Sequence, residues 1–413
     1  MTCRGRVSTP PQYSLEFPIE YQEKYLIGSK KSRSRIFSPQ NLFLTLCSLV
    51  SGTNNCGYHS AILNSLSYFL KIVNLPVKSA LSQIRQRISY KFFQDQFYNQ
   101  NEKNKLKRKT WNGLYVYAVD GLQLTLPKSD DIIKANYNGR KVSKYRESYM
   151  PKMFLTAALD VINGVVKDAR EYPTLNEVAD AIDMVKSFED NSLTIYDRLY
   201  CCRKLILEHN NQNNYFLFRL RKSVMQEMRL IFKCKSIRKT IEVDGVTIHL
   251  IKVKNPKTNE FDYFASNLPL RLVTEKTIRS LYNQRWEVEV AFRDFTQTIR
   301  LEEWHSKKIN GIRQELWTAF WLYNYCKLKI LLKLPAVKNR FSDHYQKPNF
   351  KLIFNYISTN IFSFLKRKRG LSKVIEELID RTTEKRRRHS RSYKREIKSP
   401  MSPFPYNNTV WNI

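Results

Sequence analysis

The residues best suited to chemistry in this sequence are carboxylates that follow apolar segments of a strongly basic chain. Asp120 follows the apolar run 114–119 and precedes Gly121, and Asp197 follows the short apolar run 193–196. A carboxylate withdrawn from water is costly unless a cation or hydrogen bonds compensate its charge. Acids that converge from neighbouring strands therefore suit a divalent metal site, and Mg²⁺ prefers such oxygen ligands. Two such ions promote phosphodiester chemistry, because one activates the attacking oxygen and the other stabilises the leaving oxygen.

A third acid is indicated by helical periodicity in the segment 274–299, which we expect to form one long helix. An apolar stripe along this segment should pack on the core, and it consists of Val288, Phe292, Phe295 and Ile299. A neighbouring stripe consists of Tyr282, Arg285, Glu289, Arg293 and Thr296. One interpretation is an exposed Arg–Glu–Arg face worth ~0.5 kcal/mol per pair. The other is that Glu289 completes the metal site while the tyrosine and the two arginines bind phosphates beside it.

The composition indicates a folded protein with a polyanionic partner. The chain has 413 residues, and its 71 Lys and Arg against 37 Asp and Glu give a net charge of +34. Hydrophobic residues make up 42%, which is enough to build a core and excludes wholesale disorder. A folded body with this charge repels itself unless a polyanion binds it, so nucleic acid is the expected partner.

Several other classes are excluded by what the sequence lacks. It contains neither GxxxxGK nor GxGxxG, which removes ATP and dinucleotide binding by those loops. Its seven cysteines show no CxxC spacing, so a disulfide framework or a zinc site is not expected. The N-terminal residues lack the apolar segment of a signal peptide, and no apolar run approaches ~18 residues. We therefore expect a soluble cytoplasmic protein with no membrane partner.

The elements that must position the acids divide the chain into three regions. Residues 1–110 are expected to be a helical DNA-binding region, 111–330 the catalytic domain, and 331–413 a helical, basic C-terminal region and tail. The strands expected are 114–119, 122–126, 153–161, 165–166, 193–196, 215–220, 240–243, 246–253 and 263–265. Asn163-Gly164 predicts a hairpin between two of them. The remaining helices expected in the catalytic domain are 175–188 and 312–332, the latter with a core of Trp317, Phe320 and Trp321.

The N-terminal region permits two interpretations. The helices 60–72 and 79–88 flank a Pro-containing turn and would form a helix-turn-helix, with Lys78, Gln83 and Arg85 facing DNA. The other interpretation is an ordinary helical hairpin with a solvated basic face. The polar stretch 99–109 is expected to be a linker to the catalytic domain.

Four stretches of the catalytic region, in this order, resemble the bacterial DDE transposases of the insertion sequence 4 family. Residues 282–293 (YNQRWEVEVAFR) are similar to the motif Y-x-x-R-W-x-x-E-x-x-F of that family, whose signature continues to a lysine. The other three stretches are 117–121 (YAVDG), 193–198 (LTIYDR) and 263–268 (YFASNL). The resemblance covers about residues 35–330.

This resemblance implies the fold, the reaction and the roles of individual residues. The fold would be α+β or α/β: a ribonuclease H-like mixed sheet with flanking helices and a mostly β insertion at about 198–270. The reaction would be cleavage of double-stranded DNA at inverted-repeat ends and strand transfer into target DNA, with two Mg²⁺ or Mn²⁺ ions and a homodimer in the DNA complex. Asp120, Asp197 and Glu289 would be the catalytic and metal-binding residues. Tyr282 and Arg285 would bind DNA, and we expect Arg293 and Arg198 to do so beside them. A bacterial, nucleoid-associated location follows.

Three departures from the family pattern keep alternatives open. Thr296 stands where the signature has lysine, so Arg293 or Lys307 would have to replace that contact. Leu199 stands where the second-Asp segment has glycine, which would shift the loop if the position needs a permissive backbone. The insertion has no tryptophan, so a base-stacking wedge would be Tyr215 or Phe216. The alternatives are a catalytically inactive, sequence-specific DNA-binding protein derived from a transposase, and a nuclease without strand transfer.

Overall fold

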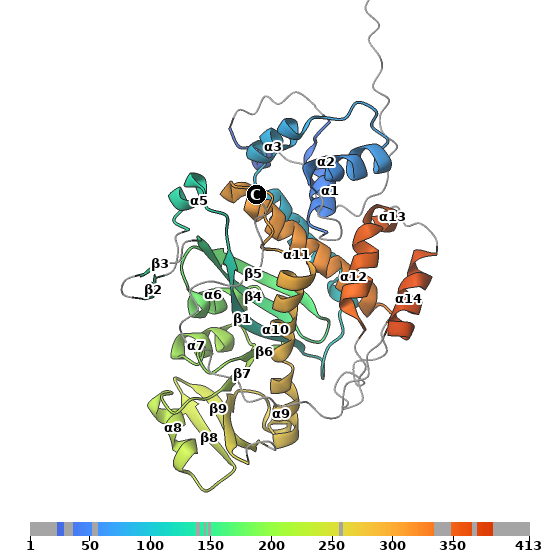
Figure 1. The fold of residues 1–413 in the computed structure, drawn as a ribbon. Helices are drawn as coiled ribbons and strands as arrows, with labels where there is room; N and C mark the ends of the chain where they lie inside the picture. Colours follow the sequence, from blue (N-terminus) through green and yellow to red (C-terminus); the bar gives the residue numbers. More distant parts are fainter. Residues whose placement is uncertain are drawn as a thin grey trace, which may run out of the picture.

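A computed structural model describes residues 23–28, 36–51, 57–137, 141–143, 146–147, 150–255, 259–333, 348–365 and 370–382 of this chain. Its centre is one eight-stranded mixed sheet with the order β5-β4-β1-β6-β7-β10-β9-β8. The strands are β1 (Tyr115–Thr125), β4 (Lys152–Asp160), β5 (Val165–Tyr172), β6 (Ser192–Tyr196), β7 (Tyr215–Arg219), β8 (Arg238–Val243), β9 (Val246–Lys254) and β10 (Phe261–Ser266). A separate pair, β2 (Lys141–Ser143) and β3 (Arg146–Glu147), lies outside this sheet (Figure 1).

The first half of the sheet has the strand order of a ribonuclease H-like domain, as the sequence predicts. β1, β4 and β5 form an antiparallel meander, and Gly164 in the β4–β5 turn has the positive φ that the Asn-Gly signal requires. β6 and β7 then pair in parallel with β1 and with each other. The fold class expected from the sequence is therefore confirmed.

The insertion continues the same sheet instead of forming a separate β layer. β7 falls within the segment 198–270 but belongs to the parallel part of the sheet. β10 then pairs antiparallel with β7, and β9 and β8 follow outward. The segment also contains the helices α7 (Arg203–Asn211) and α8 (Gln226–Lys233). Figure 1 shows these outer strands and α8 at the lower end of the molecule.

Alternate residues of β1 face two separate hydrophobic cores, because side chains of a strand point to opposite faces. Val116 and Ala118 lie in the core shared with α10 (Trp286–Arg293). Tyr117 and Val119 lie in the core shared with α6 (Glu177–Val185) and α7. Helices thus cover both faces of the sheet around β1 (Figure 1).

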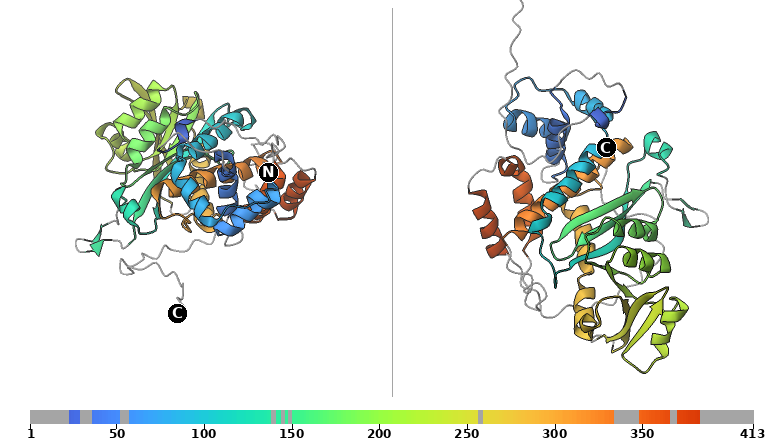
Figure 2. Two further views of the ribbon diagram at one scale, coloured as in Figure 1. Left: turned by 90° about the horizontal axis from the view of Figure 1, so that it is seen from above. Right: turned by 180° about the vertical axis from the view of Figure 1, so that it is seen from behind.

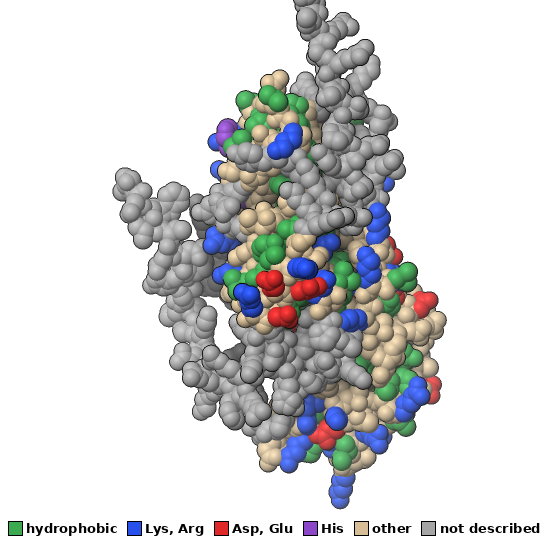
Figure 3. Space-filling view, turned by 90° about the vertical axis from the view of Figure 1, so that its right-hand side faces the viewer, with side chains coloured by type: hydrophobic (Ala, Val, Ile, Leu, Met, Phe, Trp, Pro, Cys, Tyr) green, Lys and Arg blue, Asp and Glu red, His purple; other side chains and the backbone are tan. Residues whose placement is uncertain are grey.

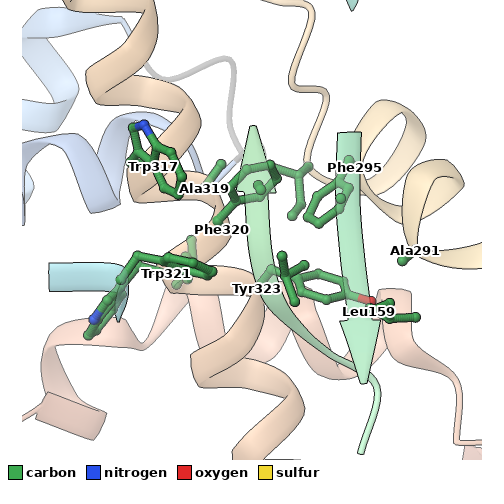
Figure 4. Packing of buried hydrophobic residues seen from close by; sticks show 14 of the residues in the cluster. Leu159, Ala291, Phe295, Trp317, Ala319, Phe320, Trp321 and Tyr323 are labelled. Atoms are coloured by element: carbon green, nitrogen blue, oxygen red, sulfur yellow. The ribbon is translucent and has the colours of Figure 1, made fainter. Parts of the chain in front are cut away.

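The helix α11 (Ile309–Leu331) joins the N-terminal helices to the sheet. It packs against α1 (Pro39–Leu49), α4 (Lys91–Lys103) and β5, and Figure 2 shows α4 lying along it from behind. Trp317, Phe320 and Trp321 are buried here, as predicted. Figure 4 shows these rings packed with Phe295 and Tyr323 beside the strands. The C-terminal helices α12 (Phe350–Thr359), α13 (Ile361–Leu365) and α14 (Leu371–Thr382) complete this part of the molecule.

The expected long helix 274–299 is divided into three pieces. α9 (Glu275–Asn283) is followed by α10 and then by the π-helical turn η5 (Asp294–Thr298). The break at Gln284 and Arg285 is a tight turn, in which the amides of Glu287 and Val288 donate to carbonyls three residues earlier. The predicted apolar stripe is nevertheless buried along its whole length, because the turn keeps it facing the core.

Two expectations for the N-terminal region are corrected. Arg85 of α3 (Lys78–Arg87) does not face DNA, since it is 1% exposed and pairs with Glu315 of α11 at 2.6 Å. The stretch 99–109 is not a free linker, since α4 runs to Lys103 and the buried amide of Asn101 donates to two carbonyls of β5. Arg85 and Asn101 both carry polar side chains that are buried by tertiary contacts. The local sequence around each residue does not predict this burial.

The basic clusters 366–369 and 385–388 lie outside the described residues. Among the helices that are described, none has the length and apolar character needed to cross a membrane.

Candidate active site

The two expected aspartates lie where β6 ends and β1 continues. Ala118, in register with Ile195, is the last β1 residue paired with β6. Asp120 therefore lies just beyond the paired region, while its other neighbour β4 still flanks it through Ala157. Asp197 directly follows β6 at the same end of the sheet. The parallel pairing thus brings two residues that are distant in sequence to one opening in the sheet.

The third carboxylate reaches this opening from α10, which packs across β1 and β4. Arg285 links it to the first aspartate. One guanidinium nitrogen lies 3.1 Å from Asp120 Oδ2, and the other lies 2.7 Å from Glu289 Oε1. The hydroxyl of Tyr282 donates to Asp197 Oδ1 over 3.4 Å. Asp120 and Glu289 therefore share the arginine that precedes α10, and Asp197 contacts the tyrosine of α9.

Burial gives Asp120 unusual electrostatics. It raises the pKa of this carboxyl to about 6, although the Gly121 amide and the Arg285 guanidinium both oppose the rise. The charges of Glu177 and Glu289 add to it. The Gly121 N–H donates to Asp120 Oδ1 at 2.9 Å, which orients the carboxylate. An added cation would favour the ionised form of this group.

Comparison with known proteins places this site in a family. Residues 111–325, which include the two aspartates, Tyr282, Arg285 and Glu289, match the family described as transposase DDE domain. The chain belongs to the DDE transposase family. It is 28% identical to the Escherichia coli K12 protein named "Putative transposase InsZ" over 38% of this chain and 54% of that protein. It is 22% identical to the E. coli K12 "Transposase InsG for insertion sequence element IS4" over 61% of each chain.

The chain spans about half to three-fifths of the length of these curated relatives. Among solved structures, a piggyBac transposase in a synaptic complex with hairpin DNA aligns with a TM-score of 0.42 and 14% identity. That alignment covers 84% of this chain and 79% of the other.

The residues expected to contact DNA in a DDE transposase fall into two groups. Tyr282 and Arg285 are turned inward and contact the acids, and the Arg285 side chain is only 8% exposed. Arg198 and Arg293 are exposed. Trp286, next to Arg285, is 48% exposed and lies with its ring centroid 5.2 Å from the guanidinium carbon.

The predicted base-stacking wedge in the insertion is wrong for Phe216, which is fully buried in β7 among the side chains of the α7 core. Tyr215 is half-buried at the start of the same strand. Trp286 is an exposed aromatic residue beside Arg285, which pairs with two of the acids. The predicted wedge does not include it, because that prediction concerns only the insertion, whereas the tryptophan lies within the signature motif.

The two substitutions in the family pattern have simple structural consequences. Leu199 does not adopt a positive φ and is 58% exposed, so the loop after Asp197 needs no glycine at this position. This departure therefore gives no structural reason for inactivity. Thr296 is turned to its own helix, where its hydroxyl donates to the carbonyl of Phe292 at 3.0 Å.

The donor set fits a hard divalent cation in its chemistry, since it consists of carboxylate oxygens. In the arrangement seen here, the guanidinium of Arg285 lies between Asp120 and Glu289. Within the described ranges, no three His, Cys, Asp or Glu side chains are grouped closely enough to hold a metal ion. Asp120 and Glu289 are thus paired with an internal cation, while Asp197 accepts from Tyr282.

One further acid approaches the site and was missed by sequence reasoning. Glu177, the first residue of α6, lies against Gly121, immediately after Asp120 in β1. No local pattern marks it, because a glutamate in the first turn of a helix is ordinary. The available signal was the glycine after Asp120, which leaves room for another side chain.

Proposed function

We propose that this protein is a DNA transposase that cleaves DNA at the ends of a mobile element and joins those ends to target DNA. The observation that carries the proposal is the bridging position of Arg285 between Asp120 and Glu289, with Tyr282 beside Asp197. These five residues come from three separated segments that the family match also includes. Asp120, Asp197 and Glu289 are the proposed catalytic carboxylates.

The same three carboxylates would hold divalent metal, Mg²⁺ or Mn²⁺, and two ions would suit the reaction. When bound, such ions supply activation of the attacking oxygen and stabilisation of the leaving oxygen. Arg285 balances the charge of two of these acids within the protein. Its Nε is buried without a hydrogen-bond partner in this structure.

Double-stranded DNA is the proposed partner, both as element ends and as target. The net charge of +34 favours a polyanion. On the face shown in Figure 3, Lys and Arg side chains lie at the upper end, in the middle and at the lower end, while Asp and Glu side chains form a central group and a few separate positions to the right and below. Arg198, Arg293 and Trp286 are exposed side chains close to the acids in sequence, and we propose that they contact the DNA end. A homodimer would allow two ends to be joined together.

The test is a strand-transfer assay with the full chain. The substrates are a duplex carrying the terminal repeats that flank its gene and a supercoiled plasmid, with Mg²⁺. The wild-type protein should cut the duplex and join it to the plasmid. Asp120→Asn, Asp197→Asn and Glu289→Gln should each abolish both products while a mobility shift shows that duplex binding persists.

Asp183→Asn is the matched control, because Asp183 is an exposed acid on α6 that pairs with Arg170. It should retain both products. Cleavage by all three active-site variants at the wild-type rate would reject the proposed function. If the wild-type protein cuts the duplex but does not join it to the plasmid, the protein is a nuclease without strand transfer.

A further inference from the structure

The carboxylate of Glu177 takes the place that a side chain at position 121 would occupy. A Cβ added to Gly121 would collide with Oε1 and Cδ of Glu177. Gly121 does not have a positive φ, so its backbone conformation does not demand glycine. Glycine is needed at position 121 because the side chain of Glu177 lies against the strand there. The carboxylate of Glu177 is thereby brought beside β1, immediately next to Asp120.

Tyr200 fixes this carboxylate from the other side. Its hydroxyl donates to Glu177 Oε2 at 3.2 Å. The ring of Tyr200 is buried and packs against Tyr196, with centroids 5.5 Å apart. Tyr196 is the last residue of β6, and Asp197 follows it. Glu177 is therefore held between the strand that carries Asp120 and the segment that carries Asp197.

The region around Glu177 contains more carboxylates than basic side chains that pair with them. Arg285 is the partner of Asp120 and Glu289. Among the described residues, neither Glu177 nor Asp197 forms an ion pair with a basic side chain. Of the four carboxylates, Asp120 and Glu289 are the two that pair with this buried guanidinium. Like charges brought together in this way favour binding of a cation.

We propose that Glu177 is a fourth carboxylate of the active site, where it binds a divalent cation together with Asp120. This inference rests on the proposed function, because it assigns a residue to the same site. The alternative is a purely structural role, in which Glu177 serves only as the acceptor for the buried Tyr200 hydroxyl. The two roles predict different effects on cation binding when Glu177 is replaced by a neutral side chain of the same shape.

Glu177→Gln separates them, because glutamine keeps an oxygen for the Tyr200 hydroxyl and loses the charge. Binding of Mn²⁺ to the DNA-free protein is measured by electron paramagnetic resonance of the free ion. The variant should bind at least one Mn²⁺ ion about tenfold more weakly than the wild type. The rise in Tm on adding Mg²⁺ should shrink as well. Asp183→Asn, which removes an exposed acid from the same helix, should bind Mn²⁺ like the wild type.

Gly121→Ala tests the geometry without changing any charge. The added methyl group meets only the end of a flexible glutamate side chain, so the strand can keep its conformation while the carboxylate moves away. The variant should keep the wild-type circular dichroism spectrum and lose Mn²⁺ affinity as Glu177→Gln does. Wild-type Mn²⁺ affinity in both variants would overturn the proposal.

The strand-transfer assay distinguishes this failure from that of the proposed function. If Asp120→Asn is inactive but Glu177→Gln binds Mn²⁺ normally, Glu177 is a structural residue and the transposase assignment stands. If Asp120→Asn cleaves normally, the proposed function fails, whatever the Mn²⁺ titrations show.

Discussion

Arg285 and Glu289 are paired at 2.7 Å across one turn at the start of α10. The sequence spacing offered two interpretations of this pair, a solvated salt bridge or a part of the active site. The pair does form, but the arginine is almost completely buried and its other nitrogen reaches Asp120 in β1. An interaction within one helix is thereby converted into a link between the helix and the central strand.

Removing this link should raise the pH needed for cleavage. Arg285 lowers the pKa of Asp120, so the pKa should move further above its present value of about 6 in Arg285→Ala. The acidic limb of the pH–rate profile should move to higher pH, and the maximal rate should fall about 10²- to 10³-fold. The profile is measured with a pre-nicked end duplex. Arg285→Lys should not restore it, because one ammonium lacks the two-pronged geometry that spans both carboxylates. An unshifted acidic limb would show that Asp120 does not depend on this guanidinium.

Asp120→Asn should stabilise the metal-free protein at alkaline pH. The folded state holds the Asp120 proton more tightly than the unfolded chain, because burial raises the pKa from 3.8 to about 6. The free energy of unfolding therefore falls as the pH rises through this interval, and the loss is complete above it. At pH 8 in EDTA the variant should be more stable than the wild type by about 1–3 kcal/mol. Denaturant titrations at pH 8 and pH 4 should show this difference disappearing at the lower pH, and a difference independent of pH would contradict the assignment.

The positions of the three expected acids follow from local patterns. The apolar run before Asp120 and the one before Asp197 each fold as a strand of the parallel pair, so their ends meet. The stripe that contains Phe292 and Phe295 folds as a buried helix face, which directs Glu289 to the same opening. Each of these features depends on a continuous apolar run or on a period of 3.6 residues, which the sequence displays directly.

The rest of the site depends on tertiary contacts that no local pattern encodes. Glu177 reaches the acids only because α6 begins beside Gly121. Arg85 resembles a DNA-facing residue of a basic helix, yet its partner Glu315 lies 230 positions away in the sequence. The inward orientation of Tyr282 also follows from the packing of α9 and α10. Helical spacing alone predicts which residues lie beside Tyr282 on the helix, but not which way that side of the helix faces.

Arg198 and Arg293 should contribute to DNA affinity through phosphate contacts. Each is exposed, and each adjoins an expected catalytic acid or lies one turn from it. Arg198→Ala and Arg293→Ala should each reduce the slope of log K against log salt by about 1. Fluorescence anisotropy of a labelled end duplex at several salt concentrations measures this slope. Arg203→Ala is the matched control, because Arg203 is exposed but already pairs with Glu227 and Asp244. An equal slope change in the control would indicate a general loss of charge.

Arg85 should contribute to stability and not to DNA recognition. Its guanidinium donates to the Gly311 carbonyl and to Glu315, both at 2.6 Å, and to the Gln314 side chain at 3.1 Å. Arg85→Ala leaves the buried carboxylate of Glu315 without its cation, so the free energy of unfolding should fall by about 3–5 kcal/mol. The double variant Arg85→Met, Glu315→Leu should recover part of this loss, because it removes the unpaired charge as well. Urea titrations measure both changes. A helix-turn-helix with Arg85 on DNA predicts the reverse, namely unchanged stability and a smaller salt slope for duplex binding.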